Sequence, residues 1–127
     1  MARILLIDDD DSVRSVLSKI LAHYGHTVIE ARNGNEGLEL FKDARADLLI
    51  TDIVMPEKEG LEVLMELRKI HPPVKIIAIS GGGRFSAMDY LQTAKLMGAT
   101  RVLEKPFTQE VLMTTINELL VDGGANG

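Results

Sequence analysis

The sequence predicts an α/β domain in which a parallel sheet carries helices on both faces. Short apolar runs alternate five times with segments in which apolar residues recur at helical spacing. The runs are continuously apolar, which is typical of strands buried on both faces, and strands joined through helices pair in parallel. Polar residues directly follow several of these runs, at the edge of the sheet where such folds bind their ligands.

The expected strands are the apolar and β-branched runs at Arg3 to Ile7, Thr27 to Ala31, Leu48 to Thr51, Val74 to Ile79 and Arg101 to Glu104. Asp8 and Asp9 follow the first strand, Asp52 follows the third, and Ser80 and Lys105 follow the fourth and fifth. Because the carboxyl ends of parallel strands meet at one edge, these five polar side chains are expected at one rim of the sheet.

The expected helices lie between and after these strands, around Val13 to Leu21, Leu38 to Ala44, Leu61 to Leu67, Ala87 to Gly98 and Leu112 to Leu119. Side-chain oxygens predict where helices begin: Asp11 or Ser12 for the first, Asn35 for the second and Thr108 for the last. Glycines at positions 25 and 98 predict where the first and fourth helices end. The residues that start and end helices therefore agree with the helices expected from the spacing of apolar residues.

Composition limits the classes of protein to consider. The chain has 127 residues, of which 46% are hydrophobic and 26% charged, which fits one domain with a single core. Fourteen basic against 19 acidic residues give a net charge of -5, so no general affinity for nucleic acid is expected. The chain contains no cysteine, no signal-peptide pattern and no apolar run long enough for a membrane span, so a cytoplasmic protein without membrane contact is expected.

The run of four aspartates from Asp8 to Asp11 is the most informative feature of the chain. Two carboxylates 4 Å apart repel by roughly 4 kcal/mol at an effective dielectric constant near 20, so a fold that gathers them needs a cation. Mg²⁺ is the candidate, because it prefers a few carboxylates together with water and phosphate oxygens. For Asp10 and Asp11 the favoured alternative is a role as helix-start residues, and for Asp8 and Asp9 that alternative weakens once Asp52 joins them.

The chain resembles the receiver domain of two-component response regulators from about Arg3 to Val121. The resemblance rests on an ordered set of motifs: Ile7-Asp8-Asp9, Thr51-Asp52-Ile53-Val54-Met55-Pro56, Gly60-Leu61, Ile79-Ser80-Gly81 and Lys105-Pro106-Phe107. It implies the flavodoxin-like (βα)5 fold, a doubly wound parallel sheet of five strands in the order 2-1-3-4-5. In such sheets the ligand lies beyond the carboxyl ends of the strands, where the strand order reverses.

The resemblance also implies the role of each acid. Asp52 would be the phosphoacceptor. Mg²⁺ would be held by Asp8, Asp9, Asp52 and the backbone carbonyl of Val54. The sequence contains no GxxxxGK motif for binding ATP, so the phosphoryl donor would be a phosphohistidine on a partner protein.

The remaining site residues implied by the resemblance contact the phosphoryl group. Lys105 would offer an ammonium group, and Ser80, together with Gly81 of the following loop, would respond to the new charge and act as the switch. One position departs from the family pattern: three residues before Lys105 the family commonly carries an aromatic switch residue, and this chain has Val102. An aromatic rotamer change is therefore not expected as the readout.

The expected organisation is a stand-alone receiver domain over residues 1–121, followed by a short disordered tail over residues 122–127. Such a domain is not a classical enzyme, although it promotes its own phosphotransfer and autodephosphorylation. The expected partners are a sensor histidine kinase or a histidine phosphotransfer protein and an unknown downstream protein. The protein is expected to be a monomer or a weak homodimer formed through the helix at Ala87 to Gly98, the strand at Arg101 to Glu104 and the helix at Leu112 to Leu119.

Two alternatives remain beside this interpretation. The spacing Asp8-x-Asp10-x-Ser12 resembles the nucleophile motif of haloacid-dehalogenase-type phosphatases, but after Lys105 the chain lacks the adjacent pair of acids that this family needs. The other alternative is a receiver-like module that binds partners without being phosphorylated. Its usual hallmark is the loss of an acid or of the lysine, and this chain retains them all.

Overall fold

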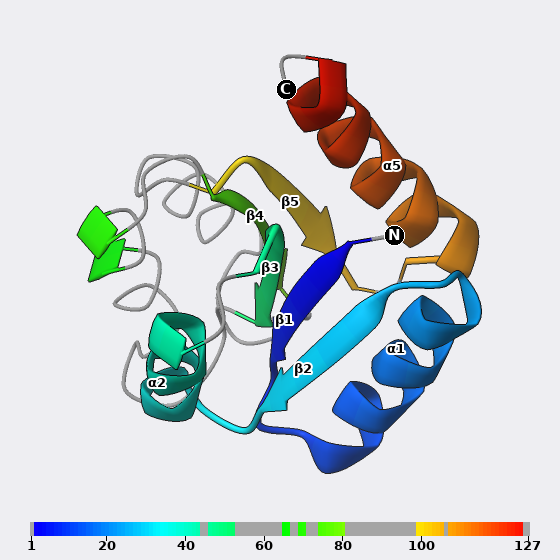
Figure 1. The fold of residues 1–127 in the computed structure, drawn as a ribbon. Coiled ribbons are helices and arrows are strands. Elements are labelled where there is room, and N and C mark those ends of the chain that lie inside the picture. The colour runs from blue at the N-terminus through cyan, green and yellow to red at the C-terminus, as the bar shows by residue number, and fades with distance from the viewer. Residues whose placement is uncertain are drawn as a thin grey trace.

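The computed structural model describes residues 2–43, 46–52, 65–66, 69–70, 74–80, 99–105 and 107–125. A sheet of five parallel strands in the order β2-β1-β3-β4-β5 forms its centre (Figure 1). The strands are β1 (Arg3–Ile7), β2 (Thr27–Ala31), β3 (Leu48–Asp52), β4 (Lys75–Ser80) and β5 (Arg101–Glu104). The α/β class and the strand order predicted from the sequence are confirmed. Strands β3 and β4 each extend one residue further than expected, so Asp52 and Ser80 are the last residues of their strands.

Helices cover both faces of the sheet, as the sequence predicted. Helix α1 (Asp11–His23) and helix α5 (Gln109–Ala125) lie on one face, and helix α2 (Gly34–Asp43) lies on the other (Figure 1). Residues 65–66 and 69–70 are also helical. Most of the helix expected at Leu61 to Leu67, and all of that expected at Ala87 to Gly98, lie outside the described residues.

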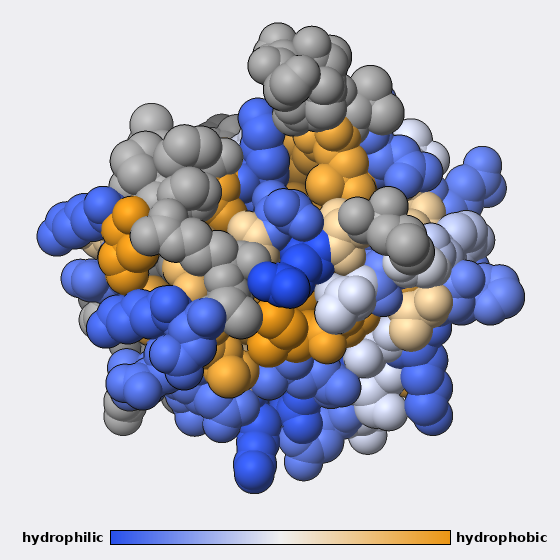
Figure 2. All heavy atoms as spheres, viewed as in Figure 1, coloured by the Kyte–Doolittle hydropathy of each residue, from blue (hydrophilic) through white to orange (hydrophobic). Residues whose placement is uncertain are grey.

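Alternate residues of each strand supply the two layers of the core. Leu5 and Ile7 of β1 face the α2 side, where Phe41 is fully buried. Ile4 and Leu6 face the other side, together with apolar residues of α1 and α5. Because successive side chains of a strand point to opposite faces, a continuously apolar strand can fill both layers. On the face drawn in Figure 2, a small hydrophilic group lies near the middle with hydrophobic surface around it, and further hydrophilic residues lie at the periphery.

Helix α2 approaches β1 closely because a glycine faces the strand. A Cβ atom at Gly37 would lie 2.3 Å from Cδ1 of Ile7, closer than real carbon contacts allow. The absence of a side chain at this position lets the helix lie directly over the end of β1. The same strand end leads into the acidic run.

The first two helices begin earlier than the sequence predicted. Asp10, rather than Asp11 or Ser12, caps α1: its backbone is extended, and its side chain accepts hydrogen bonds from the backbone N–H groups of Ser12 and Val13. Asn33, rather than Asn35, accepts from the N–H of Glu36 at 2.8 Å. Where several neighbouring residues can each cap a helix, the sequence does not determine where the helix begins. The backbone conformation determines which of them is the cap.

The last helix begins as predicted and ends later. Thr108 accepts a hydrogen bond from the N–H of Val111 at the start of α5. At the end of α1, Gly25 has the positive φ, 89°, that is typical of a residue ending a helix. Helix α5 continues to Ala125, so four of the six residues assigned to the tail have helical backbone, because each added residue of a formed helix adds one hydrogen bond. Among the described residues, no helix combines the length and apolar character needed to cross a bilayer.

Candidate functional site

Three aspartates meet at the carboxyl edge of the sheet. Asp8 and Asp9 follow β1, Asp52 ends β3, and these two strands are neighbours, with Ile7 opposite Thr51. From β1 the chain continues to β2 on one side and later to β3 on the other, so this is the point where the strand order reverses. One carboxylate oxygen from each aspartate lies within 4.8 Å of the others. The structure therefore brings together the three acids expected at this rim.

The three carboxylates differ in their exposure to solvent. Asp8 is 1% exposed and Asp52 is 8% exposed, whereas Asp9 lies at the surface. Burial raises the pKa of Asp8, and the negative charges of Asp52 and Asp9 act in the same direction. A hydrogen bond from the N–H of Asp10 to Asp8 Oδ1, at 2.8 Å, and the charge of Lys105 act in the opposite direction. The net effect is that the ionised form of Asp8 is disfavoured in the folded protein.

Lys105 brings a positive charge to the same rim. It follows β5, and its Nζ lies 3.3 Å from Oδ2 of Asp52. The lysine side chain is 28% exposed and that of Asp52 is 10% exposed, so the pair lies partly away from water. A phosphoryl group on Asp52 would lie within reach of this ammonium group.

Other predicted site residues lie partly or wholly outside the described residues. Ser80 ends β4 opposite Glu104, which places its backbone at the same edge of the sheet, but its side chain is not among those described. Val54 and Gly81 lie outside the described residues altogether. Val102 lies in β5 and packs, partly buried, against the core layer that contains Phe41.

The next two acids of the run do not join the cluster. Asp10 Oδ1 is committed to the N-terminus of α1 by two backbone hydrogen bonds. Asp11 forms an ion pair and hydrogen bond with Arg14, which lowers the pKa of its carboxyl group. Both are helix-start residues, as favoured from the sequence. Asp10 is thus engaged at the start of α1 rather than in the acidic cluster.

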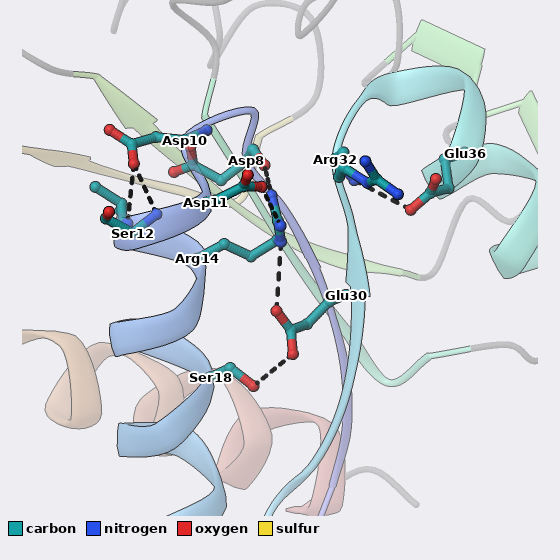
Figure 3. Close-up of polar contacts among 10 residues, drawn as sticks. Asp8, Asp10, Asp11, Ser12, Arg14, Ser18, Glu30, Arg32 and Glu36 are labelled. Atoms are coloured by element: carbon teal, nitrogen blue, oxygen red, sulfur yellow. Dashed lines mark hydrogen bonds and ion pairs between the residues drawn. The ribbon is translucent and has the colours of Figure 1, made fainter.

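Sequence reasoning missed Arg14. Its guanidinium extends from α1 toward the end of β1 and toward Glu30 of β2 (Figure 3). A basic residue near the start of a helix opposes the helix dipole, which was the available signal in the sequence. The partner in β2 lies 16 positions away along the chain, so no local pattern could identify it.

The donor set of the cluster suits Mg²⁺. Three carboxylates offer only oxygen ligands, which hard divalent cations prefer, and their spacing allows one ion to contact all three. A divalent cation would also offset the charge that raises the pKa of Asp8. The residues present therefore fit a Mg²⁺ ion at this edge of the sheet.

An apolar groove of about 460 Å³ adjoins this rim. It runs between α1 and the start of α5, and its lining includes Val16, Ile20 and Phe107. Lys105 also lines the groove, so one side chain belongs both to the groove and to the acidic site. Val16, which lines the groove, is 57% exposed.

Comparison with known proteins agrees with this geometry. Residues 4–117 match the family described as "response regulator receiver domain". The response regulator receiver protein CpdR of Brucella abortus is 36% identical over 121 residues, which cover 95% of this chain and 98% of that protein. The crystal structure of a response regulator receiver domain protein from Clostridium thermocellum superposes with a TM-score of 0.90 at 31% identity, covering 100% of both chains.

Other relatives are much longer than this chain. The sensor kinase CckA of Brucella abortus is 38% identical over 121 residues, which cover 94% of this chain but 12% of that protein. For further regulators the matched segment covers 24% to 50% of the relative. The same domain thus occurs alone, in kinases and in transcriptional regulators.

Proposed function

The chain belongs to the response regulator receiver domain family of two-component signalling, and from that premise we propose that it is a switch activated by phosphorylation of Asp52. The observation that carries the proposal is the meeting of Asp52 with two further acids and with Lys105, whose Nζ lies 3.3 Å from the Asp52 carboxylate. Receiver domains are signalling domains, so phosphorylation would act by changing the surface that the domain presents to other proteins.

The transfer starts from a phosphohistidine of a histidine kinase or a histidine phosphotransfer protein. An oxygen of Asp52 attacks the phosphorus atom, the P–N bond breaks, and its electron pair goes to the imidazole nitrogen of the donor. Lys105 holds a positive charge next to a phosphoryl oxygen. When bound, Mg²⁺ supplies a Lewis acid that neutralises the nucleophile and the phosphoryl oxygens. Asp8 and Asp9 would hold the ion with Asp52, and the Val54 carbonyl is a further proposed ligand.

The new charge then acts on neighbouring residues. The acyl phosphate carries close to two negative charges where the free carboxylate carried one, so phosphorylation adds about one negative charge and three acceptor oxygens. We assign the response to Ser80, which ends β4, to Gly81, the next residue in the sequence, and to Lys105, which follows β5. Val102 has no ring, so the readout proceeds without an aromatic rotamer change. Hydrolysis of the acyl phosphate by water returns the domain to its resting state.

The apolar groove supports a docking role for the phosphoryl donor. A phosphohistidine must reach Asp52 from outside, so the partner has to cover the surface next to the rim. The groove lies there, shares Lys105 with the site and exposes Val16. We assign the groove to the histidine-bearing partner, because a partner seated in it would hold its histidine beside the rim.

A matched pair of variants separates docking from chemistry. Val16→Glu places a charge in the groove, whereas Val111→Glu makes the same change at an exposed residue of α5 that does not line it. We expect Val16→Glu to slow transfer from the partner kinase about tenfold, as for loss of an interface hot spot, and to leave the reaction with acetyl phosphate unchanged. Equal transfer rates in the two variants would remove the groove from the docking surface.

The proposed function is tested by phosphoryl transfer from a protein donor. A histidine kinase domain is first labelled with radioactive ATP and purified, and the chain is then added with Mg²⁺. We expect the label to move to the wild-type chain and to remain on the kinase when Asp52→Asn is added. Labelling of the Asp52→Asn chain to the same extent would refute the assignment of the phosphoacceptor.

A further inference from the structure

The side chain of Arg14 joins three segments beside the acidic site. Its Nη1 donates a hydrogen bond to the backbone carbonyl of Asp8 at 2.8 Å. Its Nε forms an ion pair with Glu30 of β2 at 3.3 Å, and its other terminal nitrogen pairs with Asp11 of α1. Figure 3 shows the guanidinium lying between the end of β1, the start of α1 and β2. One side chain therefore ties the aspartate run to two neighbouring elements.

The guanidinium is held in place on more than one side. The Arg14 side chain is only 12% exposed, although it carries a full charge. Its partner Glu30 is itself anchored, because its second carboxylate oxygen accepts a hydrogen bond from Ser18 at 3.2 Å (Figure 3). A planar guanidinium holds its donors in a fixed arrangement, so contacts to two of its nitrogens also fix the position of the third, unlike in a flexible ammonium group.

The carbonyl that Arg14 holds belongs to the peptide group that joins Asp8 to Asp9. The N–H of Asp8 donates to the carbonyl of Ala31 at 3.1 Å, so the backbone of Asp8 is held at both its nitrogen and its carbonyl. The orientation of this peptide decides where the carboxylates on either side of it point. Without a cation, repulsion among Asp8, Asp9 and Asp52 would favour rotation away from one another.

We infer that Arg14 is a positioning residue for the metal site. By holding the Asp8 carbonyl, it keeps the carboxylates of Asp8 and Asp9 directed toward Asp52, and it thereby raises the affinity for Mg²⁺. The inference rests on the proposed function only in taking Mg²⁺ as the ion. Partners behind metal ligands typically change metal affinity by about 10-fold to 100-fold when they are removed.

Calorimetric titration of the unphosphorylated protein with Mg²⁺ tests the inference directly. We expect Arg14→Ala to raise the Kd for Mg²⁺ about tenfold or more. Glu30→Ala, which frees the guanidinium from β2, should raise it in the same direction by a smaller factor. The matched control is Arg101→Ala, which removes an exposed arginine that pairs with Glu118 at 3.2 Å and takes no part in the acidic cluster. This control should leave the Kd unchanged.

Arg14→Lys separates positioning from charge. The lysine keeps the positive charge but cannot reach the Asp8 carbonyl, Asp11 and Glu30 together. We therefore expect Arg14→Lys to remain weakened in Mg²⁺ binding. Full recovery of the wild-type Kd in this variant would show that charge alone matters and would overturn the positioning role.

Other outcomes are equally decisive. A folded Arg14→Ala protein that binds Mg²⁺ as tightly as Arg101→Ala would overturn the inference. If Arg14→Ala does not fold, Glu30→Ala decides by the same comparison. A wild-type protein that binds no Mg²⁺ would refute the inference, whereas one that binds Mg²⁺ but accepts no phosphoryl group would refute the proposed function and leave the affinity comparison valid.

Discussion

At the amino ends of β1 and β4, polar side chains bond to the backbone, whereas at the carboxyl edge three aspartates bring their carboxylates together. Asp47 accepts a hydrogen bond from the N–H of Arg3 at 2.9 Å. Thr100 accepts one from the N–H of Ile76 at 3.0 Å, and its own N–H donates to the carbonyl of the same residue at 2.8 Å. Each of these polar side chains accepts a hydrogen bond from a backbone N–H group near the start of a strand. These contacts satisfy backbone donors at this edge and so stabilise the fold.

The carboxyl edge carries the opposite arrangement. Asp8, Asp9 and Asp52 present carboxylate oxygens to one another, and Lys105 reaches only Asp52 by a direct contact among the described residues. Gathering like charges costs stability, and a bound cation would offset this cost. One edge of the sheet thus satisfies backbone groups, and the other gathers charges that a bound cation would offset.

Removal of the Asp9 carboxylate should have the largest effect on the rate of phosphorylation at the carboxyl edge of the sheet. Asp9→Ala takes away an exposed carboxylate of the cluster, and we expect the rate of phosphorylation by acetyl phosphate to fall about 100-fold or more, because metal stabilisation of transferred charge is worth several kcal/mol. The rate should also become nearly independent of Mg²⁺. Stopped-flow or mass measurements over a Mg²⁺ series check this. Retention of the wild-type Mg²⁺ dependence would contradict the assigned ligand.

Removal of the Thr100 hydroxyl should lower the stability of the fold without changing the acidic cluster. Thr100→Val keeps the shape of the side chain but leaves the N–H of Ile76 without its hydroxyl acceptor. We expect the free energy of unfolding to fall by about 1–3 kcal/mol, as for an unsatisfied buried donor, while the Kd for Mg²⁺ stays the same. Urea unfolding and calorimetry measure the two quantities. A change in the Kd would show that the two ends are coupled.

Neutralising Asp8 should raise stability when no metal is present. Its pKa is raised in the folded state, so the ionised carboxylate costs stability at neutral pH, and this cost disappears as the pH falls through the raised pKa to below 3.8. We expect Asp8→Asn to be more stable than wild type at pH 7 in EDTA by on the order of 1 kcal/mol, and the gap to close in acid. Asn keeps an acceptor for the Asp10 N–H. A less stable variant would contradict the expected cost of the charge.

Protonation of His26 should give the smallest effect. Its Nδ1 accepts a hydrogen bond from the N–H of Ala2 at 3.2 Å, and burial lowers its pKa below 6.5. Stability should therefore decrease as the pH falls from 6.5 toward the lowered pKa, by a few tenths of a kcal/mol for such a half-buried group. Unfolding of wild type and His26→Gln across this range measures the slope. The exposed His23→Gln serves as the control, and an equal slope in the two variants would refute the assignment.

The sheet and the central acids were predictable from sequence because their signals are local or follow from topology. Apolar runs identified all five strands, and three of them have the predicted bounds. Asp8, Asp9, Asp52 and Lys105 were expected on the same edge once the strands were parallel, because the carboxyl ends of parallel strands share one edge. The roles of these residues came from the family resemblance rather than from periodicity.

Other features depend on contacts that a local pattern does not contain. Four consecutive aspartates left the start of α1 open, and the extended backbone at Asp10 made this residue the cap. The Arg14–Glu30 pair exists only because β2 lies beside β1 and α1 packs against both. Positioning contacts of this kind require the folded structure.

Phosphorylation of Asp52 is tested most directly by intact mass after incubation with acetyl phosphate, with and without Mg²⁺, for wild type and Asp52→Asn. We expect one phosphoryl adduct on wild type, dependent on Mg²⁺ and removed by hydroxylamine, and no adduct on the variant. An adduct of the same mass on Asp52→Asn would contradict the assigned phosphoacceptor. No adduct on wild type in saturating Mg²⁺ would instead favour a receiver-like module that binds partners without phosphorylation.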